Sequence, residues 1–218
     1  MLKSLFPDID WPRVRVVGFD MDGTLYDESE FIWQCYLPIS EYLAQTIPGG
    51  SARGIRVRMY RRWLEKGSSY NRIFSEVLAD AGFPEEKQDE LSLNCVEIFR
   101  RFKPGLNLPS RVRALLDEFR QQYPIFLVSD GSAELQSAKF RSLGLSEWFA
   151  DGNVAISGVF GRGFQKPAVA ILEKVEVVKS MDDNSAVVYF GDRDVDRMFC
   201  EAAGFQHVRV SCMVPVGI

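Results

Sequence analysis

The sequence predicts an α/β protein whose core is a doubly wound, Rossmann-like parallel sheet carrying an inserted all-helical subdomain. Apolar runs without alternation, each followed by polar residues, predict strands that are covered on both faces. Helical patterns come between these runs, and one long segment after the first run favours helix throughout. We therefore assign residues 1–28 and 103–218 to the α/β core and residues 29–102 to the helical subdomain.

The strands of the core are predicted from four runs rich in Val, Ile, Leu and Phe. The runs are "VRVVGF" (14–19), "YPIFLVS" (123–129), "SAVVYFG" (185–191) and "HVRV" (207–210). The continuous apolar character fits strands of a parallel sheet, because helices cover both faces of such a sheet.

The helices of the core are predicted from apolar residues at helical spacing and from their end signals. Residues 110–122 place apolar side chains on one face, and residues 132–144 end at Gly144, a suitable C-cap. Pro167 is expected to be the first helical residue of the next helix, since proline is favoured there. The last helix, residues 195–204, closes at Gly204.

The inserted subdomain reads as helices separated by turns rich in Gly and Pro. The expected helical segments are residues 29–48, 51–67, 68–82 and 85–102. Pro38 lies inside the first segment and is expected to kink or split it.

The composition is that of an ordinary globular protein and narrows the classes of function. The chain has 218 residues, 46% of them hydrophobic and 26% charged, with a net charge of -4. There is no basic excess that would predict a nucleic-acid partner. Four separated cysteines and the single histidine, His207, predict neither a zinc site nor a disulfide framework. With no signal-peptide pattern and no apolar run of membrane-spanning length, we expect a cytoplasmic protein without a membrane partner.

Acidic residues gather where predicted strands end. Asp20 and Asp22 follow the first strand, and Asp192 and Asp196 follow the third. Each has an ordinary alternative interpretation, since Asp22 with Gly23 forms a common turn dipeptide and the later acids could cap the next helix. Ser129 alone could likewise be a helix N-cap, and Lys166 alone a surface lysine.

Taken together, these residues predict a site that binds a cation and an anion. Carboxylates crowded at one edge of a sheet repel one another, so one must be protonated or a cation must join them. Hard oxygen ligands without His or Cys favour Mg²⁺ over zinc. A metal beside helix N-termini and a lysine favours an anionic ligand, and phosphate fits best.

The ordered set "FDMDGTLYD", "LVSDG", "KP" and "YFGDRDVD" resembles the four signature motifs of the haloacid dehalogenase superfamily. The resemblance covers residues 13–211 and implies the same core fold. The helical insertion after "DGTLYD" resembles the C1-type cap of the phosphoglycolate phosphatase and β-phosphoglucomutase relatives, which implies that it closes over the core.

The resemblance implies a role for each motif residue. Asp20 would attack phosphorus and form an aspartyl-phosphate, and Asp22 would act as acid and then base. Mg²⁺ would be bound by Asp20, the backbone carbonyl of Asp22, Asp192 and Asp196, the last directly or through water. Thr24 would hold Asp22 or its loop, and Lys166 would neutralise the phosphate together with Asp20. The phosphoryl oxygens would be bound by Ser129 and by backbone amides near Asp130 and Gly131.

The resemblance therefore implies a Mg²⁺-dependent phosphatase acting on a small phosphorylated metabolite. A phosphomutase is the nearest alternative, although sugar phosphomutases of this type often carry an aliphatic residue where this chain has Thr24. A 2-haloacid dehalogenase is less expected, because those enzymes lack the second acid that Asp22 supplies. A catalytically inactive binding module is the remaining alternative. The subdomain sequence, including the run of arginines from Arg53 to Arg62, leaves the substrate open.

Overall fold

The computed structural model describes residues 2–216, which divide into two compact units. The first comprises Met1–Glu28 and Gly105–Ile218, and we call it the α/β unit. The second comprises Ser29–Pro104, and we call it the helical unit. Within the described residues, no helix has both the length and the apolar character needed to cross a membrane.

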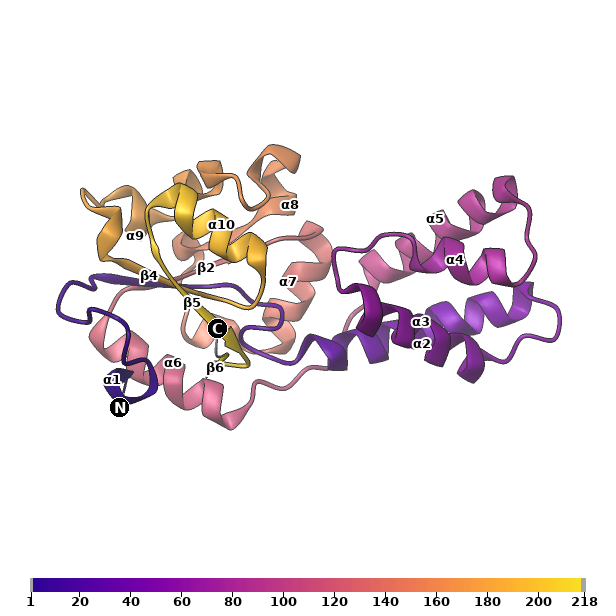
Figure 1. Cartoon of the computed structure of the whole chain (residues 1–218), viewed down its shortest axis with the longest axis horizontal. Coiled ribbons are helices and arrows are strands. Elements are labelled where there is room, and N and C mark those ends of the chain that lie inside the picture. The colour runs from indigo at the N-terminus through magenta and orange to yellow at the C-terminus, as the bar shows by residue number, and fades with distance from the viewer. Residues whose placement is uncertain (1, 217–218) are drawn as a thin grey trace. The chain divides into compact units, whose positions relative to one another are not determined.

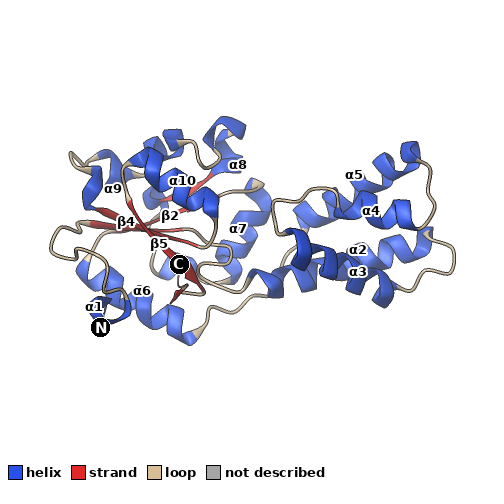
Figure 2. Cartoon of the chain, viewed as in Figure 1, coloured by secondary structure: helices blue, strands red, loops and turns tan. Residues whose placement is uncertain are grey.

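The α/β unit contains a sheet of six strands with helices on both faces (Figures 1 and 2). Its strands are β1 Val16–Phe19, β2 Ile125–Ser129, β3 Val154–Ile156, β4 Val187–Gly191, β5 Gln206–Ser211 and β6 Val214–Pro215. Its α-helices are α1 Leu2–Leu5, α6 Ser110–Gln122, α7 Ala133–Ser142, α8 Ser157–Phe160, α9 Glu176–Lys179 and α10 Asp194–Ala203. Short 3-10 helices cover Leu145–Glu147, Asp151–Asn153, Arg162–Phe164, Val169–Lys174 and Asn184–Ala186.

The strand order is β3-β2-β1-β4-β5-β6, with β1 in the middle of the sheet. Strands β1 to β5 pair in parallel, and β6 pairs antiparallel with β5. The prediction of a doubly wound parallel sheet is therefore confirmed. Because β1, β2 and β4 are neighbours and run the same way, the residues that follow them meet at one edge of the sheet.

Aromatic side chains bury the two faces of the sheet. On one face, Phe119 of α6 packs on Phe19 and Phe190 with ring centroids 5.4 and 5.2 Å apart. On the other face, Phe199 of α10 packs edge-on against Tyr189 at 5.4 Å. Figure 1 shows α6 and α10 on opposite sides of the sheet. Each fully buried side chain of this size contributes about 1.5–3 kcal/mol, so these contacts hold the strand ends firmly in place.

Gly18 lets the central strand fit between its neighbours. In the sheet register it stands beside Phe126 of β2 and Tyr189 of β4. A Cβ at position 18 would lie 2.3 Å from a ring atom of Phe126 and 2.6 Å from one of Tyr189. The absence of a side chain at position 18 therefore allows two large rings to close over β1 directly before the acidic residues.

The helix expected to begin at Pro167 is not formed there. Residues 166 and 167 lie in a turn with a cis Lys166–Pro167 peptide bond, and a short 3-10 helix begins at Val169. The backbone N–H of Lys166 donates to the Asp130 carboxylate at 3.1–3.2 Å, which holds this segment against another loop. Val175 is extended and separates the 3-10 helix from α9, as its branched side chain favours.

The sequence analysis also missed the two edge strands that contain few residues. β3 has three residues and β6 has two, which is too short for an apolar run to be distinguished from a loop. β5 is longer than the predicted residues 207–210 and runs from Gln206 to Ser211.

The helical unit consists of α2 Glu28–Thr46, α3 Ala52–Lys66, α4 Ile73–Asp80 and α5 Glu85–Arg101. Pro38 does not split α2, because buried residues such as Tyr36 and Ile39 hold the helix on both sides of it. The predicted helix over residues 68–82 is shorter than expected, since residues 68–72 precede α4.

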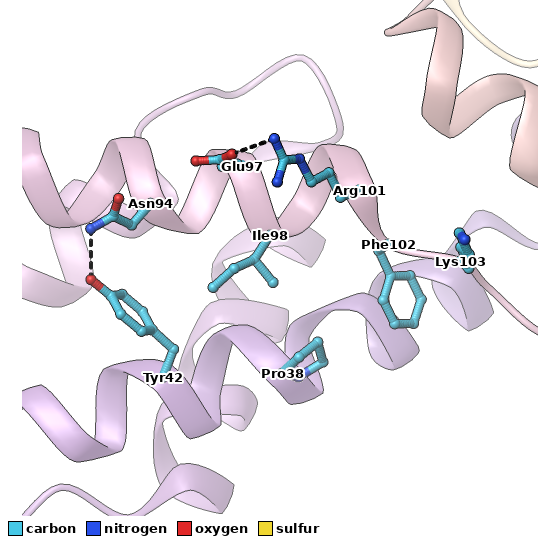
Figure 3. A pocket seen from close by; sticks show the side chains of 8 residues that line it. All are labelled: Pro38, Tyr42, Asn94, Glu97, Ile98, Arg101, Phe102 and Lys103. Atoms are coloured by element: carbon cyan, nitrogen blue, oxygen red, sulfur yellow. Dashed lines mark hydrogen bonds and ion pairs between the residues drawn. The ribbon is translucent and has the colours of Figure 1, made fainter.

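A surface hollow of about 700 Å³ lies between α2 and α5 (Figure 3). Four of the polar residues that line it pair with one another: Asn94 donates to the Tyr42 hydroxyl at 2.9 Å, and Glu97 pairs with Arg101 at 2.8 Å. None of the acids singled out in the sequence lines this hollow.

We predict that Gly18→Ala lowers the free energy of unfolding by about 1–3 kcal/mol, because the added methyl group overpacks the interface with Phe126 and Tyr189. Urea denaturation measures the change. Gly163→Ala is the matched control, since its Cβ would meet nothing within 4 Å, and it should be close to neutral. Equal effects of the two substitutions would contradict this account of β1 packing.

Candidate active site

The loops that follow β1, β2 and β4 bring together most of the residues singled out in the sequence. Asp20 follows β1 directly, and its backbone N–H donates to the carbonyl of Phe190 in β4 at 2.9 Å. Ser129 ends β2, and Asp192 follows β4. Asp196 lies in the first turn of α10, so the short α10 entry loop places it beside the same strand ends.

Lys166 is the cation at the centre of this group. Its Nζ lies 2.5 Å from Asp20 Oδ1 and 2.5 Å from Asp196 Oδ1, and its side chain is fully buried. Burial alone would lower the pKa of the ammonium, but the neighbouring charges, Asp20 first among them, raise it well above its ordinary value. Lys166 therefore stays charged. Its ammonium holds Asp20, in the loop after β1, and Asp196, in the first turn of α10, against the segment after Gln165.

Tyr189 of β4 completes the surroundings of this lysine. Its hydroxyl accepts from Lys166 Nζ at 3.4 Å and donates to the carbonyl of Val128 at 3.1 Å. The tyrosine thus links the buried ammonium to the backbone of β2, below the acidic group.

Three carboxylates can offer oxygens to one ion. Asp20, Asp192 and Asp196 each contribute an oxygen, and these oxygens lie within 4.8 Å of one another. Asp192 Oδ1 is buried without a hydrogen-bond partner, and burial raises the pKa of this carboxyl to about 7. Lys166 and Arg193 together carry two positive charges against three acids, so an additional divalent cation with a preference for oxygen fits this donor set.

Gly23 makes room for Asp192. It has φ of +73°, a conformation that favours glycine, and a Cβ there would lie 2.2 Å from Asp192 Oδ2. The loop after Asp22 is also held by β6 and its turn, since Cys212 N donates to Gly23 O and Met213 N donates to Thr24 O, both at 2.9 Å.

Thr24 has a different partner from the one expected. Its hydroxyl lies 3.5 Å from Asp20 Oδ2, a long hydrogen bond to the first acid. No hydrogen bond from its side chain to Asp22 is recorded among the described residues. Thr24 was expected to hold Asp22 or its loop, and its side-chain contact in the structure is with Asp20.

Asp22 points toward α7. Its Oδ1 accepts from Lys139 Nζ at 2.7 Å and from the Tyr26 hydroxyl, and its Oδ2 accepts from Gln136 Nε2 at 2.6 Å. Burial would raise the pKa of Asp22, but the charge of Lys139 and these hydrogen bonds outweigh it and lower the pKa. Strand β1 ends at Phe19, so the two-residue spacing of Asp20 and Asp22 falls in a loop rather than in an extended strand.

The sequence analysis missed the three residues that hold Asp22. A signal was present: Gln136 and Lys139 are three residues apart on a helix that follows a strand-end motif, so they share one face. Both are buried, although residues of these types are rarely buried without a polar partner. From the sequence alone, they looked like ordinary polar positions of an amphipathic helix.

The predicted phosphate-binding loop, Ser129 to Gly131, is already engaged in hydrogen bonds. Ser129 Oγ accepts from Gln136 Nε2 at 2.8 Å, and the Gly131 N–H donates to Ser157 Oγ at 3.4 Å. The Asp130 carboxylate accepts from the backbone of Lys166. These contacts fix the loop beside Asp20.

Arg193 and Asp194 occupy the loop between Asp192 and Asp196. Arg193 Nε lies 3.6 Å from Asp192 Oδ1, and the Arg193 backbone N–H donates to Asp196 Oδ2 at 3.0 Å. Asp194 instead points to the surface and pairs with Arg209 at 3.0 Å. Arg193 thus adds positive charge beside the acidic group, and Asp194 takes no part in it.

The arginines of α3 have mainly structural partners. Arg56 stacks over Trp33 at 3.9 Å, Arg58 pairs with Asp80 at 3.5 Å, and Arg62 pairs with Glu76 at 2.6 Å. Arg53 and Arg61 are exposed. The contacts of Arg56, Arg58 and Arg62 within the helical unit therefore explain why arginines stand at these three positions.

Known proteins resemble this chain over most of its length. The family model of the haloacid dehalogenase-like hydrolases matches residues 14–204. A glyceraldehyde 3-phosphate phosphatase of Methanothermobacter thermautotrophicus is 30% identical over 165 residues, which cover 74% of this chain and 70% of that protein.

Solved structures with a similar fold cover nearly the whole chain. A haloacid dehalogenase-superfamily hydrolase of subfamily IA, variant 1, from Geobacter sulfurreducens has a TM-score of 0.65 and 22% identity, covering 90% of this chain and 87% of that chain. A 2-haloacid dehalogenase of Pseudomonas syringae has a TM-score of 0.52 and 23% identity, covering 90% and 86%. At these identities the likeness shows the fold.

We predict that Asp192 destabilises the metal-free protein as the pH rises. The pKa of its carboxyl is 3.8 in the unfolded chain and about 7 in the folded protein, so the folded state binds the extra proton between these values. Stability is therefore lost as the pH rises through this window. In EDTA, the stability gained by Asp192→Asn should grow by on the order of 2 kcal/mol from pH 5 to pH 8.

Urea denaturation of wild type and variant across this pH range measures the difference. Asp194→Asn removes a neighbouring acid whose side chain is 71% exposed, and it should show no such trend. A benefit of Asp192→Asn that is the same at pH 5 and pH 8 would rule out the raised pKa.

Proposed function

The chain belongs to the haloacid dehalogenase-like hydrolases, and on that premise we propose that it is a Mg²⁺-dependent phosphatase that works through an aspartyl-phosphate. The proposal rests chiefly on one observation: the oxygens of Asp20, Asp192 and Asp196 gather within 4.8 Å of one another around a buried lysine. A carboxylate in such a place is suited to attack phosphorus. Its substrate would be a small phosphorylated metabolite.

Asp20 is the proposed nucleophile. One of its oxygens is held by Lys166 at 2.5 Å, while the other accepts a long hydrogen bond from Thr24 at 3.5 Å. We assign the attack on phosphorus to this second oxygen. A bond forms between it and phosphorus as the bond from phosphorus to the ester oxygen breaks, and water later attacks phosphorus to release phosphate and restore the carboxylate.

Asp22 is the proposed acid and base of these two steps. Its partners favour the ionised form, so Asp22 first takes up a proton from the phosphate monoanion or from solvent, passes it to the departing alcohol oxygen, and then takes one from the attacking water. Lys166, Ser129 and the backbone amide of Gly131 would face the negative charge of the phosphoryl group. When bound by Asp20, Asp192 and Asp196, with the backbone carbonyl of Asp22, Mg²⁺ would neutralise the phosphoryl oxygens and the crowded acids.

The concentration of charge suits a demanding reaction. Phosphate monoesters are hydrolysed so slowly in water that enzymes accelerate them by up to about 10²¹-fold. Charges fixed in a buried site, where water does not screen them, supply much of such an effect. The buried Lys166 and Asp196 are fixed in this way by packing and by each other.

The substrate proposal draws on the phosphatase relative. Its activity toward glyceraldehyde 3-phosphate makes that compound the first metabolite to test on this chain. Hydrolysis is favoured over mutase chemistry by Thr24, whose hydroxyl contacts Asp20 where an aliphatic residue could not. The dehalogenase alternative is disfavoured because Asp22 is present and held by three partners.

We predict phosphate release from p-nitrophenyl phosphate with Mg²⁺ and its loss in EDTA. Asp20→Asn should lower kcat by at least about 10³-fold, since it removes the nucleophile. Asp192→Asn should raise the Mg²⁺ concentration for half-maximal activity about 10-fold or more, because one ligand is lost. Asp194→Asn is the control in the same loop and should leave both values unchanged.

Phosphatase activity that persists both in EDTA and in the Asp20→Asn variant would contradict the proposal. Release of halide from chloroacetate would indicate a dehalogenase instead. Conversion of glucose 1-phosphate to glucose 6-phosphate, in a reaction seeded with a bisphosphate, would indicate a mutase.

We predict that a screen of phosphorylated metabolites gives its highest kcat/KM with a small sugar or three-carbon phosphate such as glyceraldehyde 3-phosphate. The physical reason is that remote parts of the true substrate supply binding energy in the transition state, which p-nitrophenyl phosphate cannot do. Phosphate release at equal substrate concentrations measures the ranking. A flat ranking across the screen would contradict the proposal of a dedicated metabolite.

A further inference from the structure

We propose that Gln136 and Lys139 of α7 are positioning residues for Asp22, an inference that rests on the proposed phosphatase function. Together with Tyr26 they hold both oxygens of this carboxylate. The clamp fixes the direction in which Asp22 presents its carboxyl to the leaving oxygen. Helix α7 thereby becomes part of the machinery that moves the proton.

The buried side chain of Lys139 contacts Asp22 of the candidate site. Its side chain is 4% exposed, and its Nζ lies 2.7 Å from Asp22 Oδ1. A buried ammonium is costly unless a carboxylate pairs with it, so a lysine here indicates a requirement at Asp22 rather than one of the core. An apolar residue would fill the same space at lower cost.

Gln136 connects Asp22 to the strand end of β2. Its Nε2 lies 2.6 Å from Asp22 Oδ2, 2.8 Å from Ser129 Oγ and 2.7 Å from the carbonyl of Asp130. With these acceptors around one amide nitrogen, the opposite orientation would place Gln136 Oε1 against a carboxylate. The amide direction is therefore dictated by the site.

The remaining atom of this amide points to the same conclusion. Among the described residues, the buried Gln136 Oε1 has no hydrogen-bond partner. Leaving a buried carbonyl oxygen unpaired costs free energy, and the hydrogen bonds that the two N–H groups of Nε2 donate to the surrounding acceptors offset that cost. The stability of the fold alone does not explain a glutamine amide with an unpaired oxygen at this position. Its contacts with Asp22 and Ser129 do explain it, because they fix Asp22 beside Ser129.

The spacing along α7 delivers both groups to one place. Gln136 and Lys139 stand three residues apart and so lie on the same helix face, while Arg141 of the same helix is exposed. Tyr26, four residues after Asp22, donates to it from the loop that follows β1. The carboxylate is thus held from two separate segments.

The position of the Asp22 carboxyl should affect the cleavage rate of alkyl phosphate esters more than that of p-nitrophenyl phosphate. When an alkyl ester is cleaved, the bond from phosphorus to the alkoxy oxygen breaks as the proton moves from Asp22 to that oxygen. A p-nitrophenyl ester releases a stable phenolate that needs no proton. Misplacing Asp22 should therefore slow the alkyl ester selectively, in proportion to the lost geometry.

The test compares p-nitrobenzyl phosphate with p-nitrophenyl phosphate, which are similar in size but leave as an alkoxide and a phenolate. The parameter is kcat/KM, because it covers only the steps up to departure of the leaving group. Lys139→Met should lower it about 10²-fold for the benzyl ester and by much less for the phenyl ester. Gln136→Met, which is nearly isosteric, should show the same selectivity, so the test does not depend on one variant folding.

Arg141→Met is the matched control, because it removes a long cationic side chain from the exposed side of α7. It should leave both esters unchanged, and Lys139→Arg should restore much of the benzyl ester activity. Equal losses on both esters in Lys139→Met and Gln136→Met, or no loss on either, would overturn the positioning role alone. A wild-type protein that cleaves neither ester would overturn the proposed function itself.

Discussion

The buried ammonium of Lys166, shared between Asp20 and Asp196, is the interaction on which the site depends. It joins a loop after β1, the first turn of α10 and the segment that follows Gln165. None of these groups could remain buried and charged by itself, because removing an ion from water without a partner costs several kcal/mol. The pairing therefore makes the burial of all three possible, while the third acid, Asp192, lies beside Arg193.

The sheet supplies the rigidity that such a pairing needs. Phe19 and Phe190 stack at 5.4 Å directly beside the strand ends, and Phe119 covers them from α6. On the other face Tyr189 packs on Phe199 and sends its hydroxyl to the lysine. Apolar packing and the polar site are thus built on the same few residues, so the geometry of the acids follows from the packing of the strands.

The sequence predicted the parts of this arrangement that repeat a simple pattern. Continuous apolar strands and helices at regular spacing identified the parallel sheet. Asp20 and Asp192 follow β1 and β4, as expected, and Asp196 lies in the first turn of α10. The residues around Asp22 could not be predicted in the same way. Gln136 and Lys139 reach Asp22 across the fold, and sequence spacing carries no information about partners so far apart in the chain.

Local conflicts explain the other differences. The helix expected from Pro167 gave way because Lys166 is held by Asp130, Asp20 and Asp196, a tertiary demand that outweighs helix propensity. Pro38 stayed within α2 for the opposite reason, since buried neighbours held the helix together. In both places packing and charge overrode the local preference of a proline.

The central place of β1 also governs how the protein is made. Val17 pairs with Ile125 on one side and with Val188 on the other. During synthesis β1 leaves the ribosome long before β2 and, later still, β4 have been made. Pairing over such separations is slow, and an apolar strand with open edges is prone to aggregate meanwhile. A ribosome-bound chain that stops before β4 thus presents a half-paired strand, which is a natural substrate for chaperones.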